Sequence, residues 1–191
     1  MGHFLYARQF LLLAGFAVLL AVITRLHFLT DLIVCFAVYG ALHALALVLT
    51  LRVRTTAWRS CLFVLGAAAL SVMTLRVGML GGRLSGALSA NLAIYAVLGL
   101  SAVTGAVAYG ILIRVFGIHE LTPRLLAVVS VGCLLATYVA FFTLTHFHSL
   151  GRWWLAVWWW YAFSAGMWYC DRRQNAQALA ASGGSGGDAA P

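Results

Sequence analysis

Long apolar stretches alternate with short polar breaks along most of this chain. A helix needs about 20 consecutive, mostly apolar residues to cross the hydrocarbon core of a bilayer. Stretches of that length cover roughly residues 5–24, 29–51, 58–80, 87–115, 122–144 and 153–170. The pattern predicts an all-α fold: a polytopic membrane protein in which residues 1–173 form a bundle of six transmembrane helices.

The apolar pattern stops after Arg173. Residues 174–191 are rich in glycine, serine and alanine and hold almost no bulky apolar side chain. Such a segment buries too little surface to offset the entropy lost on ordering. We therefore expect 174–191 to be a flexible cytoplasmic tail.

Composition agrees with a membrane protein and argues against a soluble one. The chain of 191 residues is 64% hydrophobic and 8% charged, whereas about 25% of the residues of a soluble domain are charged. Its net charge of +8 comes from twelve arginines and four acidic residues, with no lysine. The arginines stand in small groups between the apolar stretches, as topology signals do. We expect no nucleic-acid partner.

The distribution of arginine predicts the orientation, because the cytoplasmic segments of membrane proteins carry the excess of basic residues. With a cytoplasmic N-terminus, eight arginines fall in cytoplasmic segments and four in external ones. The eight are Arg8, Arg52, Arg54, Arg59, Arg114, Arg124, Arg172 and Arg173, and the four are Arg25, Arg76, Arg83 and Arg152. We expect both termini to be cytoplasmic, in a membrane of the bacterial inner-membrane type.

The external face is predicted to hold an anion or lipid-headgroup site. Arginine grips phosphate and carboxylate groups through two parallel hydrogen bonds. Arg76 matters most, because it lies about one turn inside the third stretch, where an unpaired charge is costly. Its simplest partner is Asp31, the single carboxylate on this face. The predicted site consists of Arg76, Arg25, Arg83 and Arg152, rimmed by Trp153 and Trp154 of an aromatic belt.

A metal site on the same face is an alternative. His27, Asp31, His146 and His148 supply three imidazoles and a carboxylate, a set that suits zinc or copper. Their spacing does not force them together, so we prefer the arginine site. Haem held between helices usually needs a second histidine at the depth of His43, and the other histidines lie at the membrane edges. We therefore expect no cofactor.

Polar residues inside the membrane are functional candidates by default, and His43, Asn91 and Ser101 are the ones of interest. The sequence GLSA at 99–102 resembles the G-x-S-G motif of rhomboid proteases, which are also six-helix bundles. That resemblance implies a serine nucleophile activated by a histidine of the sixth helix. Here Ala102 replaces the final glycine, and the sixth stretch contains no histidine. Because a serine nucleophile needs a base, we do not expect a protease.

Small residues recur every four positions in the fourth stretch. Residues of this kind let helix backbones approach closely in lipid. The two series are Ser101 and Gly105, and Ala102, Ala106 and Gly110. We expect this helix to be the centre of close packing.

Three adjacent tryptophans, Trp158, Trp159 and Trp160, lie too deep for an aromatic belt. At 1.5 Å per residue they are roughly 8–10 Å below the start of the sixth stretch. Adjacent indoles point in different directions, so at least one should face the bundle or a neighbour. Core packing, a partner subunit and a lipid-binding wall are all open interpretations.

The function we expect is that of a non-catalytic integral subunit or accessory component of a membrane assembly, handling a lipid-linked or anionic substrate. Catalysis by two carboxylates needs them together, and Asp31 and Glu120 fall on opposite faces. A small autonomous transporter or channel is the second hypothesis, and a membrane enzyme with a histidine-based metal or haem site is the third. The expected partners are membrane lipids and other membrane subunits.

Overall fold

A computed structural model of the chain describes residues 2–25, 31–50, 56–87, 89–118, 122–147 and 153–183. Within these ranges the chain forms six α-helices and no strand, which confirms the all-α prediction. The helices are α1 (Gly2–Arg25), α2 (Leu32–Thr50), α3 (Ala57–Gly86), α4 (Ala90–Val115), α5 (Pro123–His146) and α6 (Trp153–Gly183).

Five of these helices, α1 to α5, are long and apolar enough to cross a membrane. Helix α6 does not meet the same standard of hydropathy, because every tryptophan of the chain except Trp58 lies on it. The indole and phenol groups of tryptophan and tyrosine count as polar on a hydropathy scale, although their rings are largely apolar. The sixth span therefore stays a prediction.

Side chains that face away from the bundle are apolar along the spans. Leu11, Leu65, Leu84, Leu135 and Phe142 each expose more than half of their surface. A soluble protein rarely exposes a contiguous apolar surface of this extent, whereas lipid tails cover such a surface without cost. The helices thus suit a multi-pass protein embedded in a membrane.

The sequence signals that begin and end the helices are visible in the structure. The Thr122 hydroxyl accepts a hydrogen bond from the Leu125 amide at 3.3 Å, and Pro123 occupies the first turn of α5. A threonine N-cap followed by proline is a common start of an α-helix. At the end of α4, Gly117 has a φ of 66°. That conformation lets the Ile118 amide bond to the Ile113 carbonyl at 3.0 Å, a glycine-based helix stop.

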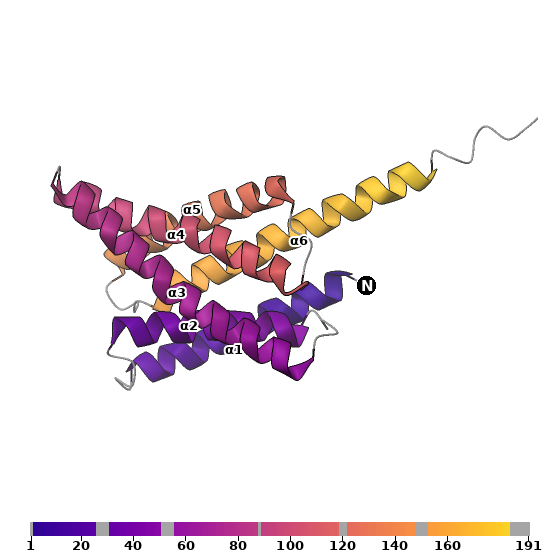
Figure 1. Ribbon diagram of the computed structural model, residues 1–191, viewed down its shortest axis with the longest axis horizontal. Helices are drawn as coiled ribbons and strands as arrows, with labels where there is room; N and C mark the ends of the chain where they lie inside the picture. Colours follow the sequence, from indigo (N-terminus) through magenta and orange to yellow (C-terminus); the bar gives the residue numbers. More distant parts are fainter. Residues whose placement is uncertain are drawn as a thin grey trace, which may run out of the picture.

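Successive helices run in opposite directions along the long axis of the bundle (Figure 1). Each helix packs against the next in the chain, and α6 returns to pack against α1. The most extensive of these contacts joins α3 to α4, and a smaller contact joins α2 to α6 across the ring. Because the helices surround a common centre, side chains from several of them can line the same space.

Glycines of α2 and α3 provide the closest helix approaches. A Cβ atom at Gly78 would lie 1.9 Å from the Ser101 hydroxyl oxygen and 2.7 Å from the Val97 carbonyl oxygen. A Cβ atom at Gly40 would lie 2.5 Å from the Ala67 carbonyl oxygen. The small residues of α4 do pack closely, as predicted, but the glycines that make the contact possible belong to α3.

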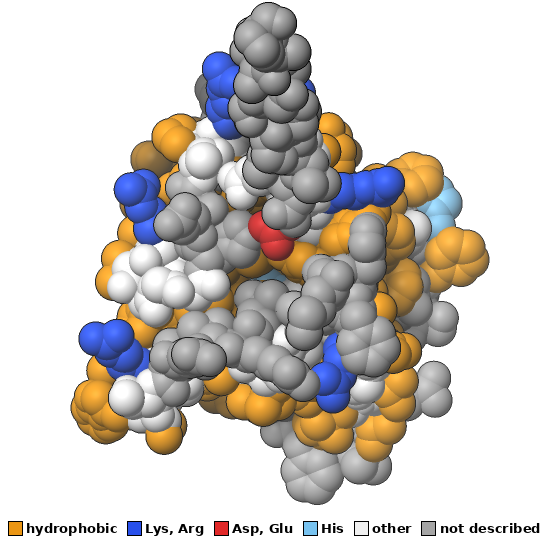
Figure 2. All heavy atoms as spheres, turned by 90° about the vertical axis from the view of Figure 1, so that its right-hand side faces the viewer, with side chains coloured by type: hydrophobic (Ala, Val, Ile, Leu, Met, Phe, Trp, Pro, Cys, Tyr) orange, Lys and Arg blue, Asp and Glu red, His pale blue; other side chains and the backbone are white. Residues whose placement is uncertain are grey.

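One end of the bundle carries most of the described arginines, and we call it the arginine-rich end. The members are exposed and come from α1, α3, α4, α5 and α6: Arg8, Arg59, Arg114, Arg124, Arg172 and Arg173. Figure 2 looks onto this end and shows basic side chains spread around it, with an acidic one nearer the middle. The opposite end holds the exposed arginines Arg76 and Arg83 of α3.

Helix α6 is longer than the sequence pattern predicts. It continues to Gly183, past the apolar stretch that stops at 170 and past the predicted start of the tail at 174. Its last turns project beyond the other helices (Figure 1). The boundary differs because QNAQALAA is rich in residues of high helix propensity, which need no apolar face to continue a helix. Residues 184–191 lie outside the described part.

Candidate functional site: a cavity inside the helix ring

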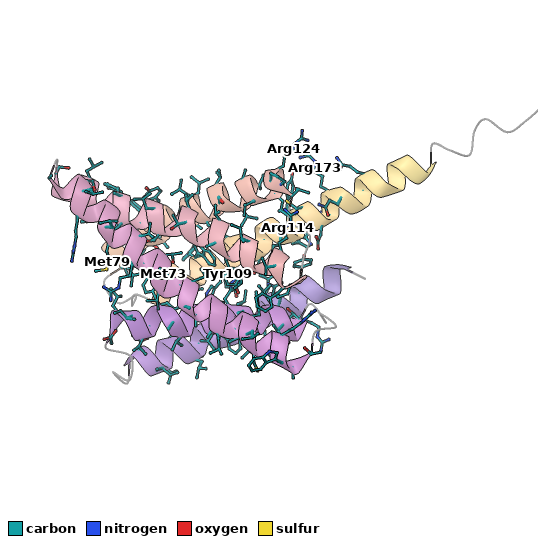
Figure 3. All side chains as sticks on the ribbon, viewed as in Figure 1. Met73, Met79, Tyr109, Arg114, Arg124 and Arg173 are labelled. Atoms are coloured by element: carbon teal, nitrogen blue, oxygen red, sulfur yellow. The ribbon has the colours of Figure 1, made fainter. Side chains whose placement is uncertain are left out.

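A half-open cavity of about 140 Å³ lies inside the ring of helices. Residues from α2, α3, α4, α5 and α6 line it. Its lining begins at Phe36, in the first turns of α2, and at Leu155, in the first turn of α6. It reaches His43 and Tyr109 near the middle of the bundle, where Figure 3 labels Tyr109. The cavity therefore extends into the interior from the end opposite the arginine-rich end.

His43 forms the inner wall of this cavity and is fully buried. Its imidazole ring lies between two aromatic rings. The ring of Tyr109 is stacked at a centroid distance of 5.0 Å, and that of Trp160 is nearly parallel at 6.1 Å. Trp159 and Phe163 present their edges to the imidazole at 5.6 Å. These four rings fix the orientation of the imidazole.

A chain of buried polar groups holds the far side of the imidazole. The Nε2 atom of His43 lies 3.5 Å from the hydroxyl oxygen of Ser164, a long hydrogen bond. The same hydroxyl oxygen accepts a hydrogen bond of 2.8 Å from the Nε2 amide of Gln9. All three side chains are fully buried, and they come from α2, α6 and α1. Polar groups at such depth are expensive unless paired, so this contact ties three helices together.

Three polar atoms of cavity residues have no hydrogen-bond partner among the described residues. They are Nδ1 of His43, the hydroxyl oxygen of Tyr109 and the hydroxyl oxygen of Ser101. The hydroxyls of Ser71 and Thr74 in the wall bond to carbonyls of their own helix. Ser71 donates to the Ala67 carbonyl at 2.9 Å, and Thr74 donates to the Ser71 carbonyl at 3.0 Å. Buried polar atoms without partners are rare in proteins, so this group of three requires an explanation.

Ser101 and His43 line the same cavity, although the sequence places them on different helices. A serine nucleophile must lie within hydrogen-bond reach of its base. The Ser101 hydroxyl has no partner, and it lies against Gly78 of α3. The nearest polar partner of His43 is Ser164, not Ser101. The arrangement does not form a serine–histidine pair.

Only part of the predicted external arginine site falls within the described residues. Arg152 and the side chain of Arg25 lie outside them, as does the side chain of Asn91. Arg76 and Arg83 are exposed on α3, seven positions apart and so on similar sides of the helix. The predicted partner of Arg76 is used elsewhere. The Asp31 carboxylate caps α2 by accepting from the amides of Ile33 at 2.7 Å and Val34 at 3.2 Å.

The predicted metal ligands are also only partly described, because His27 and His148 lie outside the described residues. The Nδ1 atom of His146 lies 2.8 Å from the Phe142 carbonyl oxygen one turn earlier on its own helix. Asp31 caps α2, as above. Across the described ranges, no three histidine, cysteine, aspartate or glutamate side chains are grouped to hold a metal ion.

The tryptophans of α6 divide between the edge of the bundle and its interior. Trp153 and Trp154 lie at the start of α6 with their rings edge to face, and the Trp154 indole donates to the Thr143 hydroxyl at 2.9 Å. Trp159 and Trp160 line the cavity, and Trp158 packs edge-on against Trp154. Of the three deep indoles, two therefore form part of the cavity wall and the third packs against another indole.

Sequence reasoning missed Gln9, Ser164 and Tyr109. Gln9 carries a signal, because it is a polar residue that interrupts an apolar stretch close to its start. Ser164 carries no such signal, because a serine in a helix often bonds to the backbone of its own helix. Tyr109 carries none either, because its aromatic ring fits an apolar stretch. The two partners of Ser164, Gln9 and His43, are 155 and 121 positions away.

Comparison of the chain with known protein families, curated proteins and solved structures finds no match.

Proposed function

We propose that this protein is a non-catalytic membrane protein that binds a lipid-soluble molecule in the cavity inside its helix ring. It would act as an integral subunit or accessory component that holds or delivers this molecule within the membrane. Binding in the cavity replaces the external arginine site as the centre of the proposal. Arg76 and Arg83 remain candidates for contacts with anionic lipid headgroups at the opposite end.

The three unpartnered polar atoms of the cavity carry this proposal. A ligand that hydrogen-bonds to them would remove the cost of leaving them unsatisfied, about 1–3 kcal/mol for each buried group. Ligand pockets are typically concave and apolar, with a few polar groups that orient the ligand. The cavity has this character, because aromatic and small side chains make up most of its wall.

A binding function fits the chemistry of the wall better than a catalytic one. No carboxylate, lysine, arginine or cysteine lines the cavity in the described part of the chain. A reaction at this place would depend on His43 and the hydroxyls of Ser101 and Tyr109, and the imidazole is enclosed by rings and contacts Ser164. Selection and retention of an apolar molecule need no more than the groups present.

The proposal includes six spans, with both termini on the cytoplasmic side of an inner membrane. Helix α6 packs in the ring between α1 and α5, and membership of the ring favours a span. Figure 3 labels Arg114, Arg124 and Arg173 near one end of the bundle. Basic residues concentrate on the cytoplasmic side of membrane proteins, so we assign the arginine-rich end to the cytoplasm.

A cavity-filling substitution tests the proposed binding function. A Cβ atom at Gly105 would meet Trp159 and Thr74 at 3.6 and 3.8 Å, ordinary contact distances, so a leucine at 105 would extend into the cavity. Gly15 has nothing within 4 Å of its Cβ position, and Gly15→Leu is the matched control. Each variant is purified in mild detergent from its native membrane, and copurifying small molecules are quantified by mass spectrometry.

We expect a lipid-soluble molecule at about one copy per chain in the wild type and in Gly15→Leu, and its loss in Gly105→Leu. Equal amounts in all three proteins, or no such molecule in the wild type, would contradict the proposal.

A further inference from the structure

The hydrogen-bond pattern around His43 indicates which ligand chemistry the cavity recognises, if the proposed binding function is correct. We propose that the ligand carries a carbonyl oxygen on a neutral group the size of one six-membered ring, as quinones and cyclic ketones do. The Nδ1–H group of His43 donates the hydrogen bond to this oxygen. The argument rests on the tautomer of His43, the size of the cavity and its lack of charge.

Ser164 sets the tautomer of His43. Its hydroxyl oxygen accepts from the Gln9 amide at 2.8 Å, so its own proton is free to donate elsewhere. Two other buried hydroxyls, those of Thr50 in α2 and Thr137 in α5, donate to carbonyls of their own helices, at Ala46 and Cys133. Ser164 has no such contact, and its second polar neighbour is Nε2 of His43 at 3.5 Å.

The Ser164 proton therefore points to Nε2 and makes that nitrogen an acceptor. A neutral imidazole carries one N–H and one acceptor nitrogen, so the proton of His43 resides on Nδ1. This atom is buried, has no partner and belongs to a residue of the cavity wall. Because His43 is fully buried, a ligand reaches this N–H only when the rings beside it move aside, and it must then offer an acceptor.

The imidazole and its ligand are both neutral. His43 is fully buried, and the described residues of the cavity wall include no carboxylate or other charged side chain that would pair with an ion. An unpaired charge at this depth is costly. A carboxylate or phosphate ligand is therefore disfavoured, whereas a ketone oxygen accepts a hydrogen bond without carrying a charge.

The size of the cavity limits the part of the ligand that enters it. An apolar cavity of about 150 Å³ in another protein takes up benzene, and the volume here is about 140 Å³. One six-membered ring fills such a space. Trp159, Trp160 and Tyr109 supply flat faces and edges suited to a ring, and any apolar tail would leave through the open side.

Three probes with the same tail distinguish the chemistry: decyl-1,4-benzoquinone, decylhydroquinone and decylbenzene. The first presents acceptors, the second presents O–H donors, and the third presents neither. Their dissociation constants are measured by native mass spectrometry on the full-length protein released from detergent. Wild type, Gly105→Leu, His43→Phe and His43→Asn are compared, and thermal melting in detergent checks that each variant is folded.

We expect the quinone to bind the wild type roughly tenfold more tightly than decylbenzene, as one buried hydrogen bond implies. His43→Phe should remove that preference, so that the quinone and decylbenzene bind this variant with similar affinity. His43→Asn retains an N–H donor close to the position of Nδ1, so this variant should keep part of the preference for the quinone. Gly105→Leu should weaken all three probes.

Tighter binding of the hydroquinone than of the quinone would overturn the inference, because it would mean that Nδ1 accepts. Equal responses of the quinone and decylbenzene to His43→Phe would overturn it as well. In both cases, weaker binding of all three probes to Gly105→Leu would still support the proposed binding function. If Gly105→Leu affected none of the probes, the binding function itself would fail.

Discussion

At the scale of single residues, buried polar side chains differ in whether a partner satisfies them. Ser164 of α6 and Ser130 of α5 are both buried serines. Ser164 accepts from Gln9 and contacts His43, whereas the Ser130 hydroxyl has no partner among the described residues. Loss of one hydroxyl should therefore have different consequences at the two positions.

Ser164→Ala should lower the free energy of unfolding in detergent by about 1–3 kcal/mol. The substitution leaves the Gln9 amide and Nε2 of His43 buried without their shared partner, and an orphaned buried group costs that much. Ser130→Ala, the control, removes an unsatisfied hydroxyl and should change stability by less than about 0.5 kcal/mol or raise it slightly. Reversible unfolding in mixed detergent measures both, and equal losses would show that the Gln9–Ser164–His43 contact adds no stability.

At the scale of helices, glycine decides how closely α3 approaches its neighbours. Small residues allow close backbone packing where the hydrophobic effect gives no drive for association. The positions of Gly78 and Gly105 show that two glycines on neighbouring helices play different parts. A side chain at Gly78 would collide with the Val97 backbone, whereas one at Gly105 would enter the cavity.

Gly78→Ala should destabilise the bundle by about 1–3 kcal/mol, since over-packing forces the backbones of α3 and α4 apart. The same change at Gly132, whose Cβ position has nothing within 4 Å, serves as the control and should be neutral. Adding Ser101→Ala to Gly78→Ala should recover stability only in part, because the Val97 carbonyl oxygen would still lie 2.7 Å away. Wild-type stability of Gly78→Ala would mean that the helices are not in close contact there.

At the scale of the whole molecule, charge is distributed unevenly between the two ends. Exposed arginines of five helices gather at the arginine-rich end, where the Asp171 carboxylate accepts a hydrogen bond from the Tyr6 hydroxyl. That bond joins the start of α1 to α6. If α6 spans the membrane, the two ends of the chain lie on the same side, and with five spans they lie on opposite sides.

Reporter fusions after Gly86 and after Phe147 should be external, and fusions after Gly117 and after Arg173 should be cytoplasmic. The reason is that the last two positions lie beside arginines of the arginine-rich end, and such segments are retained in the cytoplasm. Alkaline phosphatase activity marks external fusions and green fluorescence marks cytoplasmic ones. An external fusion after Arg173 would reduce the spans to five and refute the six-span topology.

The sequence by itself determined the class of the molecule and the positions of its helices. The length of each apolar stretch and the polar breaks between stretches are local features, and each acts through neighbouring residues of the same segment. For that reason the all-α fold and most helix bounds could be predicted. The end of α6 could not, because its alanine-rich extension has helix propensity without the apolar pattern on which the prediction relied.

Only the tertiary structure decided which polar side chains meet. Gln9, His43 and Ser164 lie on three helices, and neither their spacing nor their chemistry indicates a common centre. A transmembrane helix is apolar on all sides, so its sequence does not reveal its rotation about its own axis. Packing of the glycines of α2 and α3 and of the α6 indoles sets that rotation, and it turns His43, Ser101 and Tyr109 to a single cavity.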